Sequence, residues 1–260
     1  MKIDHLHIVC FKWKKLYSAA DVNTLRAMVA RNLTVPHTFH CVTDDPKELD
    51  PAIVAHPLIL PERIRHDIGN GRKLQSFGTD FLGLEGQFAV ISDIDVVIVG
   101  NLDFLADRPD QDFLITRGHL QFANTRGHSA FYRIKIGSHA YLWDWLVADP
   151  EGAATTCQHH RGAPGHISDQ RWLDRQVETM NFFPDGKIVY FRHHCSARGQ
   201  YVLGKLGERL GLSTALFGIA APPPGAAVVS FAGQPKPQMV AHRHHDLFRR
   251  APFVAKHWRV

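Results

Sequence analysis

Short apolar runs alternate with helix-like segments along the first part of the chain. Residues 6–11 and 38–43 are compact apolar runs that predict buried strands, and residues 21–33 place apolar side chains at helical spacing. Asp21 is the candidate cap of this helix, and Pro36 follows its end. The succession of strand, helix and strand is typical of an α/β domain with a largely parallel sheet.

The same alternation continues to the end of the sequence. Further strands are predicted over 88–100, 113–116, 129–136, 187–191 and 226–231, and helices over 72–82, 138–148 and 169–180. Ser168 is the expected cap of the last of these helices. The segment 152–167 is expected to be a loop, and the proline run at 221–225 a stiff connector. We find no internal repeat and expect a single domain.

The composition is ordinary for a soluble globular protein. An apolar content of 45% over 260 residues is enough to build one large core. The four cysteines are widely spaced and include no Cys-x-x-Cys pair, which favours buried thiols in a reducing cytoplasm over a disulfide framework. No apolar run reaches the ~18 residues of a membrane span, and the N-terminus shows no signal peptide. We therefore expect a cytoplasmic protein.

Charge adds only a weak preference for anionic partners. The formal net charge of +5 suits a nucleotide diphosphate, an anionic lipid surface or an acidic glycan, and is too small to indicate nucleic acid. Basic and aromatic side chains interleave over residues 241–260, which we separate from a main domain over residues 1–240. This last segment either makes peripheral contact with the inner membrane surface or an anionic acceptor, or packs on the domain as a final amphipathic element. We favour packing.

Two carboxylates, Asp93 and Asp95, interrupt the most apolar stretch of the sequence, residues 88–100. A buried carboxylate without a partner is costly, and side chains at i and i+2 of a strand point to opposite faces unless the chain bends. Ligands bind at the carboxyl end of parallel strands, and carboxylate oxygens suit Mg²⁺ or Mn²⁺, which stabilise a leaving diphosphate. The alternative is that both residues end a strand and cap a turn. We favour the metal hypothesis, and the enzyme hypothesis depends on it. Both require carboxylates that face a cleft and are not neutralised by lysine or arginine partners.

Other polar residues have weaker signals. The acidic pair 44–45 precedes Pro46 and is predicted to begin a helix. The basic pair 72–73 follows a Gly-rich turn, at a helix start where cations are disfavoured, which favours a phosphate role. Lys236 stands between two prolines that would hold its cation in place for an anion. The eighteen histidines match no zinc spacing, and those of the later segments are expected in surface loops.

The order of the segments resembles the glycogenin-like GT-A glycosyltransferases and related bacterial proteins. The sequences that carry the resemblance are, in chain order, HIVCFKW, DVNTLRAMVARNL, VTDD, RKL, SDID, DQRW and GQPKP. Together they span roughly residues 6–240. The resemblance implies a Rossmann-like GT-A domain, with a mostly parallel sheet flanked by helices. It also implies transfer of a sugar from a nucleotide-sugar, a UDP-sugar above all, to a glycan, lipid or protein acceptor. The resemblance also suggests that the reaction retains the anomeric configuration of the sugar, an inference that is based on analogy between folds.

The resemblance also implies roles for single residues. The expected donor-binding residues are Phe11, Lys12 and Tyr17 around the base, Lys73 and Asp93 at the nucleotide, and Gly233 and Lys236 at the diphosphate. Asp93 and Asp95 would ligate Mn²⁺ or Mg²⁺. Asn124 or Ser129 would hold the transferred sugar, and Asp169 and Gln170 would approach its anomeric carbon as further catalytic residues. For Asp169, a purely local role is also open, because acidic residues stabilise a helix N-terminus.

One position departs from the family pattern. A histidine commonly precedes the glycine of the last motif and is the third metal ligand, whereas this chain has Ala232 there. Two carboxylates, diphosphate oxygens and water remain acceptable for Mg²⁺. Weaker metal affinity, a substitute such as His242, or loss of activity are the alternatives. A catalytically inactive nucleotide-sugar-binding protein is therefore the second hypothesis, and a basic interaction module built on residues 241–260 is the third.

Overall fold

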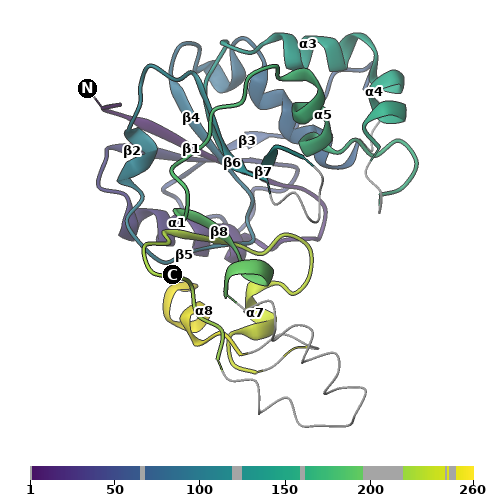
Figure 1. The fold of residues 1–260 in the computed structure, drawn as a ribbon. Helices are drawn as coiled ribbons and strands as arrows, with labels where there is room; N and C mark the ends of the chain where they lie inside the picture. Colours follow the sequence, from purple (N-terminus) through teal and green to yellow (C-terminus); the bar gives the residue numbers. More distant parts are fainter. Residues whose placement is uncertain are drawn as a thin grey trace.

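A mixed six-stranded sheet forms the centre of the molecule (Figure 1). The computed structural model describes residues 2–64, 68–118, 125–158, 162–195, 219–243, 245 and 250–260. The strands, in sheet order, are β3 (Ile53–Pro57), β2 (His37–Thr43), β1 (Leu6–Lys12), β4 (Phe88–Ser92), β7 (Gly127–Lys135) and β6 (Phe113–Arg117). The first four are parallel, and β7 runs antiparallel to both of its neighbours. This confirms the predicted α/β class with a mostly parallel sheet.

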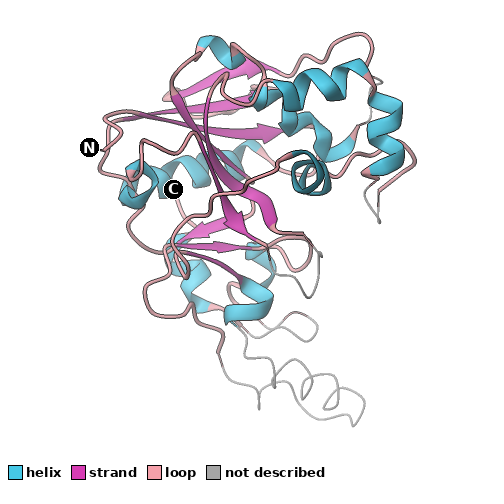
Figure 2. Ribbon diagram, turned by 45° about the horizontal axis from the view of Figure 1, so that its top comes forward, coloured by secondary structure: helices cyan, strands magenta, loops and turns pink. Residues whose placement is uncertain are grey.

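The predicted strand 88–100 is in fact two strands in two sheets. After β4 the chain bends, and β5 (Val96–Ile98) joins a smaller sheet in the order β5-β9-β8 (Figure 2). In this sheet β9 (Val228–Ser230) is antiparallel to β5 and parallel to β8 (Ile188–Tyr190). The bend between the sheets contains both aspartates that interrupt the apolar run.

Helices cover both faces of the large sheet. The α-helices are α1 (Ala19–Asn32), α3 (Tyr141–Ala148), α4 (Pro150–Thr156), α5 (Asp169–Gln176), α7 (Pro237–Val240) and α8 (Pro252–His257). Short 3-10 helices span Gly69–Phe77, Phe81–Gly83 and Asp103–Ala106, and a π-helical turn spans Phe191–Cys195. One core packs α1 and α8 against the sheet, and the other packs α3, α5 and the first 3-10 helix against the opposite face.

Several local predictions need correction. The expected loop 152–167 begins inside α4, whose cap is Asp149, with Pro150 at the first helical position. The segment 72–82 forms 3-10 helix, and the chain after the acidic pair 44–45 forms turns that lead into β3. Asp21 is the third residue of α1 rather than its cap, and it bonds reciprocally with the true cap, Ser18.

The C-terminal residues pack on the domain, as the favoured alternative requires. Val254 of α8 is fully buried, and Phe253 and Trp258 pack against the same core as α1. Arg31 of α1 donates to the backbone carbonyls of residues 257 and 259 at 2.9 and 2.7 Å. Within the described part of the chain, no helix has both the length and the apolar character needed to cross a membrane.

A row of histidines crosses the three neighbouring strands β1, β2 and β3. His7 Nδ1 lies 3.0 Å from His40 Nε2, and His40 Nδ1 lies 3.0 Å from His56 Nε2. His7 Nε2 is 2.7 Å from Gln87 Oε1, which accepts its hydrogen. If each ring is neutral, every Nε2 donates and every Nδ1 that faces a ring accepts, so one set of tautomers satisfies the whole row. Protonation of the middle ring would break this pattern.

Arg133 of β7 fixes the segment that leads into β6. Its side chain is fully buried, and its guanidinium donates to the carbonyls of Leu105, Asp107, Arg108 and Gln111 at 2.5 to 3.0 Å. The ring of Phe88 lies 5.0 Å from the guanidinium carbon. Backbone carbonyls thus satisfy a charge that would otherwise be costly to bury.

Candidate active site

A pocket of about 290 Å³ opens at the bend between the two sheets. It gathers most of the residues that the sequence singled out: Phe11, Tyr17, Lys73, Asp93, Asp95, Ser129, Asp169, Gln170, Gly233 and Lys236. They come from the end of β1 and the loop that follows it, the first 3-10 helix, the bend after β4, the start of β7, the start of α5 and the loop after β9. The pocket therefore lies at the carboxyl edge of the parallel strands, where ligands bind in open α/β sheets.

The bend explains how both aspartates face one pocket. The backbone N–H of Asp93 still donates to the carbonyl of Ala130 in β7, at 2.8 Å. Ile94 then enters the core and is 1% exposed, and Asp95 accepts at its carbonyl from the N–H of Phe231, at 3.0 Å. On a straight strand the two carboxylates would lie on opposite faces. Here the chain turns between them, and both line the pocket.

Lys73 links two carboxylates at the back of the pocket. Its Nζ lies 2.7 Å from Asp93 Oδ1 and 2.8 Å from Asp169 Oδ2, and it donates to the carbonyl of Ser129 at 3.1 Å. Two hydrogen bonds and one ion pair therefore surround the ammonium of a residue that is only 3% exposed. Lys73 thus joins the end of β4 to the start of α5, and its predicted contact with a nucleotide receives no support from these bonds.

Charge crowding shifts the pKa values of this group. Burial lowers the pKa of Lys73, but the carboxylates of Asp169 and Asp93 raise it above its ordinary value overall. Burial raises the pKa of Asp93 to about 6; Lys73 opposes this rise, and the charges of Asp95 and Asp169 add to it. The ammonium is what allows carboxylates to share so small a space.

Lys236 is the second lysine that lines the pocket. Its Nζ is 2.5 Å from Asp95 Oδ2 and donates to the hydroxyl of Tyr17 at 2.9 Å. The ammonium also lies 5.1 Å from the centroid of the Tyr17 ring. Burial, followed by the charge of Asp95, raises the pKa of Tyr17, so the phenol stays protonated. The Lys236 side chain is 20% exposed, in contrast to the 4% of Lys73.

The remaining predicted residues divide into three cases. The Gln170 amide donates to the hydroxyl of Thr125, which orients Gln170 at the start of α5. The Lys12 ammonium donates to the carbonyl of Asp45 at 2.9 Å, and Lys12 does not line the pocket. Its predicted place beside a nucleotide base therefore lacks support. Asn124 lies outside the described residues.

His128 lines the pocket and was missed by the sequence analysis. It opens β7 as an isolated histidine in a strand, which gives no local signal. Burial, followed by the charge of Lys73, lowers the pKa of His128 to about 4, so the ring is neutral at physiological pH. Its Nδ1 accepts from the N–H of Ala130 at 3.1 Å, which leaves the hydrogen on Nε2. His128 therefore offers the pocket a hydrogen-bond donor without a charge.

The side chains around Asp93 and Asp95 do not fit the divalent-ion site that the sequence predicted. The metal hypothesis, and the sequence argument for an enzyme that depended on it, required aspartates without cationic partners, whereas Asp93 and Asp95 are each paired with a lysine ammonium. Ala232 lines the pocket where a third ligand was expected, and His242 is exposed and does not line it. Among the residues that the structure describes, no group of three His, Cys, Asp or Glu side chains could hold a metal ion.

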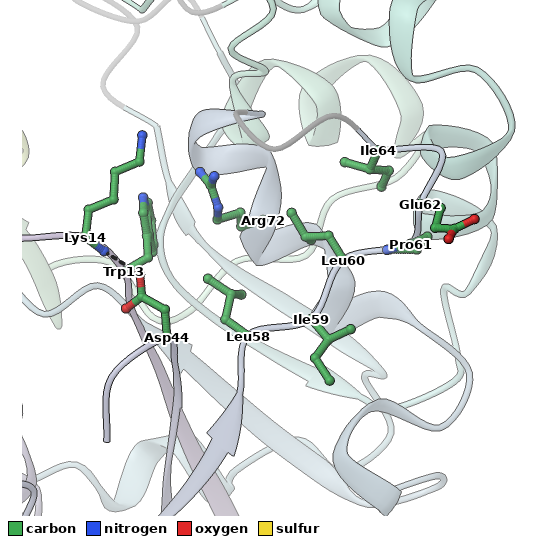
Figure 3. A pocket seen from close by; sticks show the side chains of 10 residues that line it. All are labelled: Trp13, Lys14, Asp44, Leu58, Ile59, Leu60, Pro61, Glu62, Ile64 and Arg72. Carbon is green, nitrogen blue, oxygen red and sulfur yellow. Dashed lines mark hydrogen bonds between the residues drawn. The ribbon is translucent and has the colours of Figure 1, made fainter. Parts of the chain in front are cut away.

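A larger pocket of about 880 Å³ adjoins the first, because Trp13 lines both (Figure 3). It lies beyond the carboxyl ends of β1, β2 and β3, and its walls include the apolar residues 58–60. Asp44 accepts from the N–H of Lys14 at 2.9 Å. The guanidinium of Arg72 lies 5.5 Å from the centroid of the Trp13 ring. This pocket combines a flat aromatic face with charged groups at its edge.

No family model and no curated protein matches this sequence. Solved structures do match. The chain is similar over 98% of its length to the galactosyltransferase LgtC, solved in complex with donor and acceptor sugar analogs, with a TM-score of 0.57 and 12% identity, and it spans 97% of that chain. It is similar over 89% of its length to the glycosyltransferase GlyE of Streptococcus pneumoniae TIGR4, with a TM-score of 0.56 and 12% identity. It is similar over 90% of its length to the bifunctional glycosyltransferase WbbM, with a TM-score of 0.56 and 11% identity.

The chain spans about half of two of these proteins, namely 56% of GlyE and 47% of WbbM. At identities this low, the similarity shows the fold alone. The chain therefore has the GT-A fold, and the fold predicted from the sequence is confirmed.

Proposed function

We propose that this chain transfers a sugar from a nucleotide-sugar donor, with UDP-sugars as the favoured class, to an acceptor hydroxyl. The observation that carries the proposal is the pocket at the bend between the sheets. It combines Lys236, a partly exposed cation that lines the cavity, with carboxylates that suit the hydroxyls of a sugar. The GT-A fold adds weight, because LgtC is a galactosyltransferase with this fold.

The two adjoining pockets suit the two ends of such a donor. We assign the nucleoside to the larger pocket, where the ring of Trp13 gives a base a surface for stacking. The diphosphate and sugar then occupy the smaller pocket. Gly233 has φ of +80°, a left-handed conformation that allows the chain to turn directly after β9 and bring its backbone to the diphosphate.

The proposed reaction needs charge stabilisation at two places. The bond between the anomeric carbon and the diphosphate oxygen breaks, and its electron pair leaves with the diphosphate. The acceptor oxygen bonds to the anomeric carbon, and its proton passes to the departing diphosphate. Lys236 would stabilise the negative charge on the leaving group, and Asp169 would stabilise the positive charge that builds on the sugar ring. Gln170 would hold a sugar hydroxyl.

The first test is a thermal-shift screen with UDP, GDP, ADP and their sugars, followed by an assay for released nucleoside diphosphate. One nucleotide should raise the melting temperature of the wild type. The rise should disappear in Lys236→Ala and persist in Lys47→Ala, which removes an exposed lysine outside the pocket. If no nucleotide stabilises the wild type, the proposal is refuted.

A nucleotide-sugar-binding protein without activity is the second candidate. Ala232 and the absence of a three-residue ligand set among the described residues favour it. Binding of a donor without release of nucleoside diphosphate, with any glycan, lipid or protein acceptor, would distinguish it from the enzyme. A cytoplasmic location and a peripheral membrane contact stay predictions from the sequence.

A further inference from the structure

The charges of the smaller pocket balance almost completely without an added ion. Among the described residues, its charged side chains are the carboxylates of Asp93, Asp95 and Asp169 and the ammoniums of Lys73 and Lys236. Each carboxylate has an ammonium within 2.5 to 2.8 Å. One negative charge remains in excess, which is too little to attract a divalent ion as strongly as unpaired carboxylates would.

A divalent ion at Asp93 and Asp95 would have to compete with these ammoniums. The same oxygens would need to turn from Lys73 and Lys236 to the metal, and the lysines would then lie next to a second cation. The ammonium of Lys73, once displaced from Asp93, would lose one of its three protein partners while it stays buried. Mg²⁺ also demands about six ligands, and Ala232 supplies none.

From this disagreement with the expected metal site we propose that Lys236 takes the place of the divalent cation, so that the donor diphosphate is bound without Mn²⁺ or Mg²⁺. This inference rests on the proposed function. Lys236 is suited to the role because two of its three N–H groups have protein acceptors, Asp95 and Tyr17. Among the described residues, no acceptor is paired with the third N–H, which leaves it for a phosphate oxygen. The ammonium of Lys73, in contrast, is buried and held by two hydrogen bonds and an ion pair.

Tyr17 acts in this scheme as a positioning residue. Its hydroxyl accepts from Lys236, and its ring lies beneath the ammonium. Together with Asp95 on the other side, it fixes the cation at the wall of the pocket before any ligand arrives. A preorganised cation costs no rearrangement when the diphosphate binds or leaves.

The test is calorimetric titration of UDP into protein that has been stripped of metal with EDTA, in parallel with protein supplied with Mn²⁺. The two dissociation constants should agree within about threefold. Lys236→Ala should weaken binding by at least about tenfold in both conditions, whereas Lys236→Arg should retain most of the affinity. Thermal unfolding of each variant, with Lys47→Ala as the matched control, shows whether the fold is intact.

A second readout keeps the result independent of nucleotide binding. Mn²⁺ is titrated directly into the protein, and binding is followed by the loss of the paramagnetic resonance signal of free Mn²⁺. The wild type and Asp95→Asn should bind Mn²⁺ equally, because no specific site at Asp95 is expected. UDP binding that requires Mn²⁺ would overturn the inference and leave the proposed function standing. If neither UDP nor any other nucleotide of the thermal-shift screen binds in either condition, both are overturned.

Discussion

Acid should destabilise this fold through the histidine row of β1, β2 and β3. Burial, followed by the neighbouring rings of His7 and His56, lowers the pKa of His40 from 6.5 to about 4. The pKa values of His7 and His56 are lowered as well, chiefly by burial. The neutral rings are therefore favoured in the folded state. The stability they contribute is complete above a pH of about 6.5 and is lost as the pH falls towards 4.

The magnitude follows from the pKa of His40 alone. At about pH 5, the unfolded chain has protonated this histidine almost fully, whereas the folded chain has barely begun to do so. The difference corresponds to roughly 2 kcal/mol of lost unfolding free energy. His40 is 5% exposed, so solvent screening reduces this figure little. His128, whose pKa is also about 4, adds a loss of the same sign.

Urea unfolding, followed by tryptophan fluorescence at several pH values, measures this loss. His40→Gln keeps a polar side chain but removes the titrating ring. Between about pH 8 and 5, the unfolding free energy of this variant should therefore fall by roughly 2 kcal/mol less than that of the wild type. His37→Gln is the matched control, because His37 lies on the same strand and bonds to the carbonyl of Val35 outside the row. Equal pH dependence in the two variants would refute the reasoning.

Three further predictions concern buried charges and the pocket. Arg133→Leu should lower the unfolding free energy by about 4 kcal/mol, because four carbonyls lose their donor; urea unfolding tests this, and a loss below about 1 kcal/mol would contradict it. Lys73→Met should cost about 3–5 kcal/mol at neutral pH, because Asp93 and Asp169 lose their shared cation. The cost should shrink below pH 6, where Asp93 takes up a proton, and a pH-independent cost would count against the ion pairs. Tyr17→Phe should weaken UDP binding by about threefold, measured by calorimetry, and an unchanged affinity would exclude Tyr17 as a positioning residue.

Most strands were predictable because buried strands appear in the sequence as apolar runs. β3 was not predicted, because most of its side chains are not buried, and the order of the strands in the sheets was not predicted either. The break at Asp93 and Asp95 was also visible, because carboxylates in such a run demand a partner. The partners were not visible. Lys73 precedes Asp93 by 20 positions and Lys236 follows Asp95 by 141, and only the packing of the loops brings them together.

The missed elements have specific causes. The start of α4 carries a usable signal in Asp149 and Pro150, but the glycine and alanines that follow suggested a loop. His128 shows no pattern, because its burial depends on β7 meeting β6 and α5. The histidine row likewise depends on strand pairing across β1, β2 and β3, which no single segment reveals.

The most direct test of the central claim, that a nucleotide occupies the pocket beside the bend, is a titration with UDP followed by tryptophan fluorescence. Trp13 lines both pockets, so its emission should change saturably as UDP binds. The change should be absent in Trp13→Phe, which keeps an aromatic ring at this position. A wild-type signal that does not respond to UDP, or one that survives unchanged in Trp13→Phe, would contradict the account.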